Sequence, residues 1–307
     1  MEDTPQYSLS FSFILIVVIA AVIMAGVWGV KLYSGELLYA QALQSKDYKV
    51  AEAKLVRATE LQPNVASYHA ALAQVYLLEA LDAAKLSKPD VGVVSTLVAK
   101  AVNEAKLATE KSPGTVAIWE NLAIMYENAA SLVPDAREWA IKTWQQALKL
   151  EPTNAVLYWR LANNYGAKES WDEAIKNYRQ AISLKKDYVG SYIGLARVYD
   201  QTKQSDKAIE TYQGILGLAA NNQEVLFNYG LLLYNRNKRG DRDEAEKLWL
   251  EAVRLAPNYS NALYSLGLLH EIRGEKSEAL QYYYKVKDLN PENKDITTKI
   301  RILVGGK

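Results

Sequence analysis

The sequence predicts an all-α protein, in which one transmembrane helix precedes a solenoid of about seven helix–turn–helix units. Two observations carry this prediction. One is a run of 22 uncharged residues near the N-terminus, and the other is a pattern of small, aromatic and proline residues that returns along the remaining chain. The chain has 307 residues, half of them hydrophobic, so one large or two modest domains have ample material for a core.

The uncharged run covers Leu9–Val30. As a helix it spans about 33 Å, enough for a bilayer hydrocarbon core of about 30 Å. Trp28 and Tyr33 lie where aromatic residues gather at membrane interfaces, and Lys31 ends the run. The run therefore predicts a transmembrane helix at 9–31.

A cleaved signal peptide is the alternative interpretation of this run. Signal peptides begin with a basic segment, whereas the short tail at 1–8 carries Glu2 and Asp3 and no basic residue. We therefore expect an uncleaved, single-pass anchor. The basic residues all follow the run, beginning with Lys31 and Lys46, and this favours a cytoplasmic location for the domain after it.

A repeated pattern fills the rest of the chain. A proline ends five apolar segments, at Pro63, Pro113, Pro152, Pro257 and Pro291. Five residues before each proline stands Ala58, Ala108, Ala147, Ala252 or Val286, and seven before that stands Ala51, Ala101, Ala140, Ala245 or Ala279. Two segments keep the pattern without the proline, as Ala174, Tyr178 and Ala181, and as Ala208, Tyr212 and Ile215.

The segment before each of these carries a second pattern, W-x-x-L-A-x-x-Y, at Trp119–Tyr126 and in related form at Tyr158–Tyr165, Tyr192–Tyr199 and Leu263–His270. Small residues at fixed positions let two antiparallel helices approach to about 8–10 Å, and the proline ends the second helix. Polar residues after the prolines are placed to cap the next helix, at Thr115, Asn154 and Asn258.

This pattern resembles the tetratricopeptide repeat (TPR), which has Trp, Leu-Gly, Tyr and then Ala, Phe, Ala, Pro within 34 residues. The resemblance covers residues 32–291 in seven units and implies a right-handed superhelical solenoid. No Gly/Ser linker follows the anchor, so we expect the membrane helix to run on into the first repeat helix. The segment 292–307 is expected to form a capping helix and tail.

Two units depart from the standard spacing, and in one of them Tyr126 and Ala140 are 14 residues apart. In the other, Tyr76 and Ala101 are 25 residues apart, where the standard repeat has 9. The extra residues keep helical periodicity on both sides of Lys88-Pro89-Asp90, which predicts an over-long helical hairpin closed by a proline turn.

Composition and motifs argue against catalysis. The 36 basic and 35 acidic residues give a net charge of +1, which attracts no polyanion, so no nucleic-acid partner is expected. The chain has no cysteine, its two histidines (His69 and His270) stand at packing positions, and no phosphate loop is present. Acidic pairs stand at the starts of second helices, where the helix dipole favours them. We expect no enzyme, cofactor, metal or small-molecule substrate.

The TPR resemblance implies a binding groove formed by the first helix of each unit. It also implies that the second, fifth, ninth and twelfth residues of each unit face this groove. The candidate residues for a protein or peptide partner are Trp159, Asn163, Ile193, Arg197, Asp200, Phe227, Tyr234 and Tyr264. An apolar ladder beside Asn, Arg and Asp suits an extended or helical peptide with hydrophobic anchors. The alternative is that the ladder packs neighbouring repeats together.

Two functions follow from these expectations. The first is a membrane-anchored TPR scaffold that recruits a protein partner through its concave groove. The second is an accessory module or C-terminal tail of a bacterial O-antigen ligase- or polymerase-type enzyme, because a membrane helix followed directly by repeats resembles the C-terminal part of those proteins. Those enzymes have many more membrane helices than this chain.

Overall fold

The computed structural model of the chain describes residues 6–131, 133, 135–219 and 221–305, with side chains from residue 13 onward. Parts of the predicted tails, residues 1–5 and 306–307, lie outside the described residues. The described residues form fifteen α-helices and no strand, which confirms the all-α fold class. The helices are α1 Gln6–Leu43, α2 Tyr48–Leu61, α3 Ala66–Ala84, α4 Val91–Lys111, α5 Val116–Ala129, α6 Ala136–Leu150, α7 Ala155–Ala167, α8 Trp171–Leu184, α9 Val189–Gln201, α10 Ser205–Leu216, α11 Gln223–Arg236, α12 Asp241–Leu255, α13 Ser260–Ile272, α14 Lys276–Leu289 and α15 Lys294–Val304.

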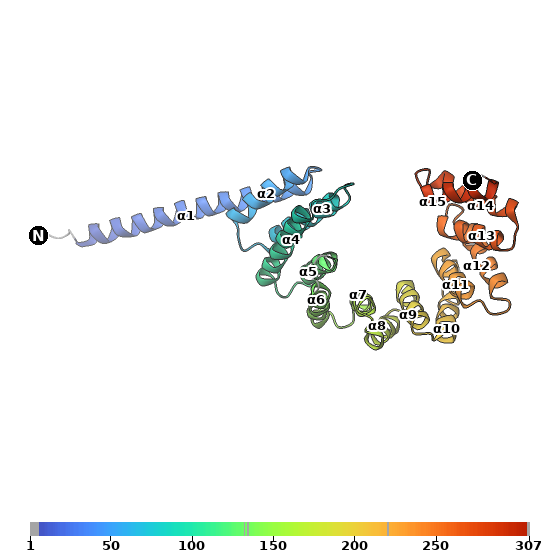
Figure 1. Cartoon of the computed structure of the whole chain (residues 1–307). Coiled ribbons are helices and arrows are strands. Elements are labelled where there is room, and N and C mark those ends of the chain that lie inside the picture. Colours follow the sequence, from blue (N-terminus) through green and yellow to red (C-terminus); the bar gives the residue numbers. More distant parts are fainter. Residues whose placement is uncertain (1–5, 132, 134, 220, 306–307) are drawn as a thin grey trace, which may run out of the picture. The chain divides into compact units, whose positions relative to one another are not determined.

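The chain forms two compact units, Met1–Pro152 and Thr153–Lys307. The first unit contains α1–α6 and the second contains α7–α15. Within each unit, consecutive helices pack as antiparallel pairs: α1 with α2, α3 with α4 and α5 with α6 in the first, and α7 with α8, α9 with α10, α11 with α12 and α13 with α14 in the second (Figure 1). These seven pairs agree with the predicted number of repeats.

Small residues at the predicted positions let the paired helices approach closely. The alanines of the second helices are buried, at Ala51, Ala58, Ala101, Ala108, Ala140, Ala147, Ala174, Ala181, Ala208, Ala245, Ala252 and Ala279. In the first helices, glycine makes room for a ring of the partner helix. A Cβ added at Gly230 would lie 2.6 Å from Nε1 of Trp249, and one at Gly267 would lie 2.5 Å from Cε1 of Tyr283. The glycines of the repeat pattern therefore stand where an aromatic ring of the second helix packs against the backbone of the first helix.

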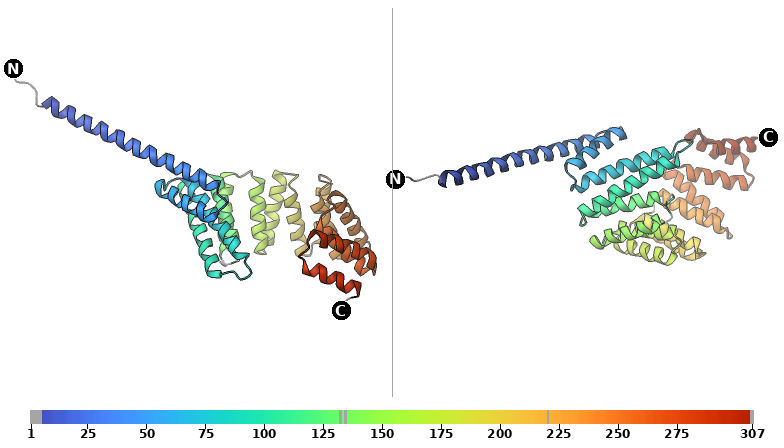
Figure 2. Two further views of the ribbon diagram at one scale, coloured as in Figure 1. Left: turned by 90° about the horizontal axis from the view of Figure 1, so that it is seen from above. Right: turned by 60° about the vertical axis from the view of Figure 1, so that its left-hand side comes forward.

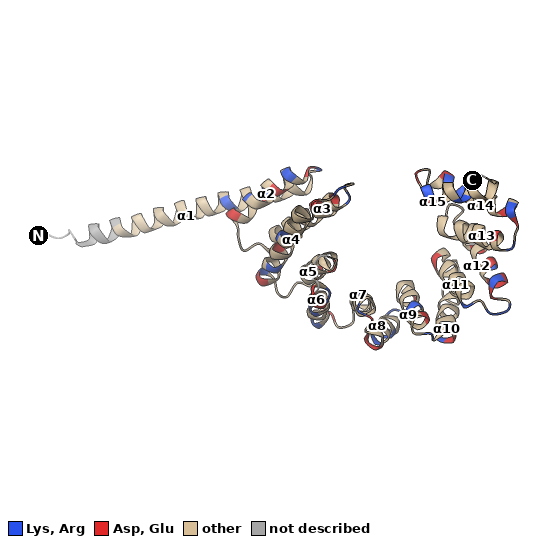
Figure 3. Cartoon of the chain, in the orientation of Figure 1, with Lys and Arg blue, Asp and Glu red and all other residues tan. Residues whose placement is uncertain are grey.

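Helix α1 is continuous over 38 residues, so the first apolar segment does run on into the first repeat helix (Figure 2). Its described side chains from Phe13 to Val30 are exposed and uncharged, and Lys31 is the first charged residue of α1. Figure 3 accordingly shows the described part of the apolar segment in tan, without charged residues. Further along, Gly35 is buried beside Gln62 and Tyr68, and Ala42 is also buried. Within the described part of the chain, α1 is the one helix long and apolar enough to cross a membrane, a property that signal sequences share.

Two further predicted elements are present. The over-long hairpin consists of α3 with 19 residues and α4 with 21. The capping helix predicted within 292–307 is α15, and it buries Ile296 and Ile300 in a cluster with Leu263 and Tyr283. This cluster covers the apolar side of the last repeat.

The expected helix caps are confirmed only in part. Asn154 caps α7, because its Oδ1 accepts a hydrogen bond from the first turn. Thr115 stands at the N-cap of α5, but its hydroxyl pairs with that of Ser112 at 2.7 Å instead of with the helix backbone. The expectation for Asn258 is wrong, since Tyr259 occupies the N-cap of α13. The N-cap stands two residues after the proline there, as it does after Pro113 and Pro152, whereas Asn258 follows Pro257 directly.

Candidate functional site

In the second unit, the first helix of each repeat belongs to one layer, which consists of α7, α9, α11 and α13. α7 contacts α9, and α9 contacts α11, as well as their partners within each pair. Since neighbouring helices approach most closely on the concave side of a curved array, these helices line the inner side of the unit (Figure 1). We call the exposed side of α7, α9, α11 and α13 the inner face. All eight candidate binding residues belong to these four helices.

A small pocket of about 70 Å³ opens on the inner face between α9 and α11. We call it the α9–α11 pocket; its lining residues are Ala196, Arg197, Asp200, Tyr212, Asn228, Leu231, Leu232 and Asn235. Arg197 is exposed and Asp200 is half-buried. Among the described residues, neither side chain has a hydrogen-bond or ion-pair partner. The two predicted charged residues therefore lie together with their polar groups available.

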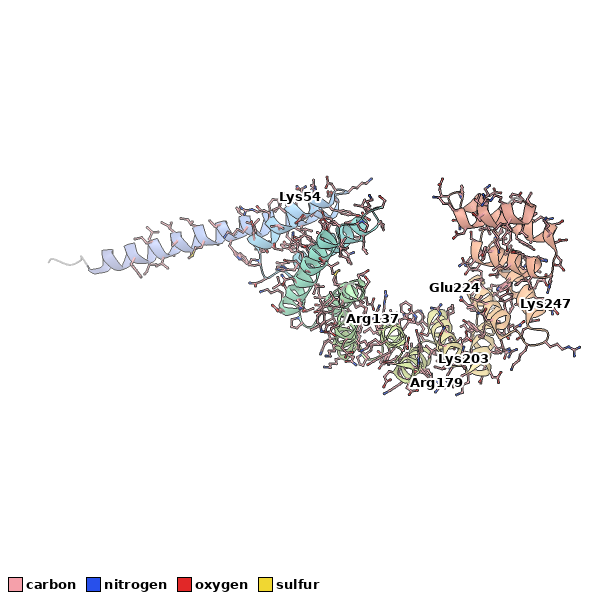
Figure 4. All side chains as sticks on the ribbon, in the orientation of Figure 1. Lys54, Arg137, Arg179, Lys203, Glu224 and Lys247 are labelled. Carbon is pink, nitrogen blue, oxygen red and sulfur yellow. The ribbon has the colours of Figure 1, made fainter. Side chains whose placement is uncertain are left out.

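The buried ring of Tyr212 forms the floor of this pocket. Burial raises the pKa of its hydroxyl, Arg197 lowers it, and Asp200 and Glu224 raise it further. The hydroxyl therefore stays protonated near neutral pH. The ring stacks on Tyr229 with 5.6 Å between centroids, which fixes the floor. Glu224 projects from the first turn of α11 toward the inner side, whereas Lys247 lies on the outer side of the unit (Figure 4).

A larger pocket of about 400 Å³ lies between α13 and α15. We call it the α13–α15 pocket; its lining residues are Phe227, Ser260, Asn261, Tyr264, Ser265, Val286, Asn290, Asn293, Asp295 and Ile296. Tyr264 is 38% exposed, and its ring tilts against that of Tyr283 with 5.8 Å between centroids. Nδ2 of Asn290 donates to Oγ of Ser260 at 3.1 Å. Two aromatic walls and several amide and hydroxyl groups thus surround one cavity.

Trp159 and Asn163, on α7, are both half-buried and both contact other elements. The indole of Trp159 packs edge-on against Tyr188 at 5.8 Å, and the Arg160 guanidinium lies 5.0 Å from its ring. Asn163 accepts a 2.6 Å hydrogen bond from the hydroxyl of Tyr178. Each of these residues therefore has a packing role alongside its partial exposure.

The remaining candidates differ in what they expose. Ile193 is only 5% exposed and belongs to the core, so it offers almost no surface to a partner. Tyr234 is half-buried and packs on Trp249 at 5.5 Å. Phe227 is half-buried and packs edge-on against Tyr259 at 5.5 Å. The predicted ladder of Trp159, Ile193 and Phe227 is therefore interrupted at its middle residue.

The structure adds asparagines that were not among the candidates: Asn228 and Asn235 in the α9–α11 pocket, and Asn261 in the α13–α15 pocket. Asn261 stands at the second residue of its unit, one of the positions that the TPR resemblance implies. Asn228 directly follows the fifth residue, Phe227, and the spacing rule alone does not select it. Amides can donate to and accept from a peptide backbone, which suits an extended ligand.

The histidines and acidic pairs occupy structural positions. Nδ1 of His69 lies 2.7 Å from a carboxylate oxygen of Glu104, and the ring of His270 stacks on Tyr282 at 5.4 Å. Acidic residues stand in the first turns of α8 and α12, as the helix dipole favours. Within the described residues, no group of three or more His, Cys, Asp or Glu side chains could hold a metal ion.

Two segments of the chain match family models of the tetratricopeptide repeat, residues 165–226 and residues 235–294. Both segments lie in the second unit, which therefore contains TPR repeats. No curated protein matches the sequence.

Solved structures extend the comparison to most of the chain. A TPR protein from Parabacteroides merdae is similar with a TM-score of 0.62 at 13% identity, over 89% of this chain and 100% of its own. The C-terminal part of a TPR repeat-containing protein from Cytophaga hutchinsonii is similar with a TM-score of 0.58 at 15% identity, over 86% of this chain and 97% of its own. At these identities the likeness shows the fold alone, and that fold is a TPR solenoid.

Proposed function

We propose that this protein is a non-catalytic scaffold, anchored in a membrane by α1, that binds a protein partner on the inner face of its second unit. One observation carries the proposal. Arg197 and Asp200 lie in the α9–α11 pocket without an ion-pair or hydrogen-bond partner among the described residues. Asp200 is half-buried, where a charged side chain that serves only stability is usually paired, and the exposed Arg197 beside it is available to a ligand.

The chemistry of the two pockets suggests the kind of segment that binds. Arg197 can form a two-pronged hydrogen bond with a carboxylate, and Asp200 can accept from a backbone or side-chain N–H group. Tyr264 and Phe227 offer ring surfaces to an apolar side chain in the α13–α15 pocket. An extended peptide with an acidic residue and an apolar anchor matches these groups, and Asn228 and Asn261 can bind its backbone.

A site-specific crosslink tests this assignment, because the chain has no cysteine and accepts single cysteines without background. Asn235→Cys places a photo-crosslinker on the inner face, and Lys247→Cys places the same reagent on the outer side, where Lys247 is 73% exposed. We expect Asn235→Cys to give a discrete crosslinked partner in membranes from the source cells, and Lys247→Cys to give none. Equal products from both positions would contradict the inner-face assignment.

Charge reversal then measures the contribution of the α9–α11 pocket to the affinity for the identified partner. Arg197→Glu should weaken binding by about tenfold or more, because hydrogen bonds to charged groups contribute about 1.5–3 kcal/mol. The matched control is Lys247→Glu, the same charge reversal on the outer side, and it should leave the affinity unchanged. Unfolding curves of both variants show whether the fold is intact.

The membrane anchor is tested by fractionation. The full chain should sediment with membranes and resist extraction by carbonate, and a chain without residues 1–31 should be soluble. The long apolar helix α1 supports this expectation, and the uncharged, exposed side chains of Phe13–Val30 give the physical reason. A truncated chain that stays in the membrane would contradict the anchor, and removal of the segment during export would identify a signal sequence.

A further inference from the structure

A pocket lies where α1 passes from its apolar segment into the first repeat. Its volume is about 230 Å³, and it is formed by Trp28, Lys31 and Leu32 of α1 together with the segment Leu61–Val65 that links α2 to α3. Most of its lining is apolar, and Lys31 is its one charged residue. We call it the α1–turn pocket. The role of α1 as an anchor does not by itself explain why a repeat turn rests at this point.

The side chain of Gln62 holds the α2–α3 turn against α1 through hydrogen bonds, which we call the latch. Nε2 of Gln62 donates to the carbonyl oxygen of Leu32 at 3.0 Å and lies 3.2 Å from the hydroxyl of Tyr68. Gly35 makes the latch possible, since a Cβ at that position would overlap the Gln62 amide. The turn is therefore fixed at the level of Lys31 and Leu32 along the axis of α1.

Lys31 and Leu32, which the latch joins to the turn, stand at the end of the uncharged segment of α1. Trp28 is 66% exposed and Lys31 is exposed, and they follow the uninterrupted apolar side chains from Phe13 onward. Tryptophan and lysine in this order mark the boundary between the hydrocarbon and the headgroups. If α1 crosses the bilayer, the latch holds the α2–α3 turn at the depth of the lipid headgroups.

The charges at the pocket favour an anion. The amine of Lys31 has no ion-pair partner among the described residues, and no lining residue is acidic. Nζ of Lys111 donates to Oδ1 of Asn64 at 3.0 Å, which brings a second cation to the rim. The first turn of α3 lacks a side-chain cap, so the positive end of its dipole also adjoins the turn. The apolar walls suit the glycerol and upper acyl region of a phospholipid.

We propose that the α1–turn pocket binds the headgroup of an anionic phospholipid from the bilayer that α1 crosses, and so holds the first repeat on the membrane surface. This inference rests on the proposed anchor. It goes further in assigning a lipid site to residues of the repeat domain, Leu61–Val65, and in placing the α2–α3 turn at the interface.

Depth measurements on the full chain in vesicles test the placement separately from the anchor. Three single-cysteine variants carry a nitroxide: Ala20→Cys within the apolar segment, Asn64→Cys in the turn, and Lys46→Cys in the turn at the far end of the same helix pair. Lys46 follows the end of α1, about 18 Å beyond Lys31 at 1.5 Å per residue. We expect the Ala20 label to collide with oxygen in the lipid, the Lys46 label with an aqueous nickel complex, and the Asn64 label to lie at phosphate depth.

Lipid preference is measured on the cysteine-free chain with headgroup-photoactivatable phosphatidylglycerol and the matching phosphatidylcholine probe. Phosphatidylglycerol should crosslink preferentially to the segment Leu61–Val65. The variant Lys31→Gln should lower that yield about fivefold, the effect of one basic residue near an anionic surface, while the control Lys46→Gln leaves it unchanged.

The outcomes distinguish the lipid site from the membrane anchor on which it rests. An Ala20 label in lipid with an Asn64 label in water, or an unchanged yield for Lys31→Gln, overturns the lipid site and leaves the anchor standing. An Ala20 label in water overturns the anchor and the lipid site together.

Discussion

The hydroxyl of Tyr178 donates a 2.6 Å hydrogen bond to Oδ1 of Asn163, so a buried ring of α8 holds an asparagine of the inner face. The same ring fills the space above Gly194 of α9, where an added Cβ would overlap it. Burial raises the pKa of Tyr178 to about 12, and nearby Arg197 lowers it. The hydroxyl therefore remains a donor at neutral pH. One side chain thus joins two neighbouring repeats and orients a candidate binding residue.

Tyr178→Phe tests this connection, because it keeps the ring and removes only the donor. We expect the free energy of unfolding to fall by about 1 kcal/mol, the usual contribution of a hydrogen bond inside a protein. The control is Tyr192→Phe, whose hydroxyl donates to the carbonyl of Lys186 at an exposed site, and it should cost less. Urea denaturation measures both. Equal losses of unfolding free energy would mean that burial of the Tyr178–Asn163 hydrogen bond adds nothing to stability.

The glycines of the repeat pattern give a second prediction. Gly230→Ala should destabilise the second unit by about 1–3 kcal/mol, because the new Cβ would lie 2.6 Å from Nε1 of the buried Trp249. Gly214→Ala is the control, since nothing lies within 4 Å of its added Cβ in α10. There alanine should stabilise the helix by up to about 1 kcal/mol. Thermal unfolding followed by circular dichroism shows whether the two substitutions act in opposite directions.

The capping helix α15 provides a third test within one element. Ile300 is 6% exposed in the cluster with Tyr283, and Ile302, two residues later, is 63% exposed. Ile300→Ala should lower stability by about 2–4 kcal/mol, whereas Ile302→Ala should change it by less than about 0.5 kcal/mol. Hydrogen exchange of the α14 amides should accelerate in the first variant alone. If both variants behave alike, α15 does not cap the last repeat.

The sequence predicts the helix pairs well because their contacts are local. Small residues such as Ala245 and Gly230 stand where a helix meets its own partner, and these positions return with every repeat. Contacts between repeats are harder to foresee. Ile193 is off the main apolar stripe of α9, yet it is buried, since residues from neighbouring repeats cover it.

The same limit applies to the candidate site. Arg197 and Asp200 lie at one pocket as their spacing suggests, and their role in binding stays a prediction. The contacts of Trp159 with Tyr188, and of Phe227 with Tyr259, join neighbouring repeats, as the alternative interpretation of the ladder expects, but the spacing does not identify the two tyrosines. Both tyrosines stand at helix N-caps, where polar capping residues are the usual expectation, and here their rings instead bridge adjacent repeats.

The fourth prediction concerns His69, which joins three elements of the first unit. Its Nδ1 lies 2.7 Å from a carboxylate oxygen of Glu104 in α4, and its Nε2 lies 3.1 Å from the carbonyl oxygen of Pro63 before α3. Both neighbours accept hydrogen bonds, so only the protonated ring can donate to both. The hydrogen bond with Glu104 raises the pKa of His69, burial lowers it, the Pro63 carbonyl raises it again, and Lys111 opposes the rise.

A raised pKa in the folded state means that the folded chain binds this proton more tightly than the unfolded chain does. The stabilising effect is therefore complete below the unfolded value of about 6.5, and it is lost as the pH rises through the folded pKa. The unfolding free energy of the first unit should thus fall as the pH rises from about 6.5 through the folded pKa of His69. His69→Gln should remove that part of the slope, because glutamine does not titrate. Urea denaturation of both chains across this range measures the difference, and parallel pH profiles would show that His69 is not the group responsible.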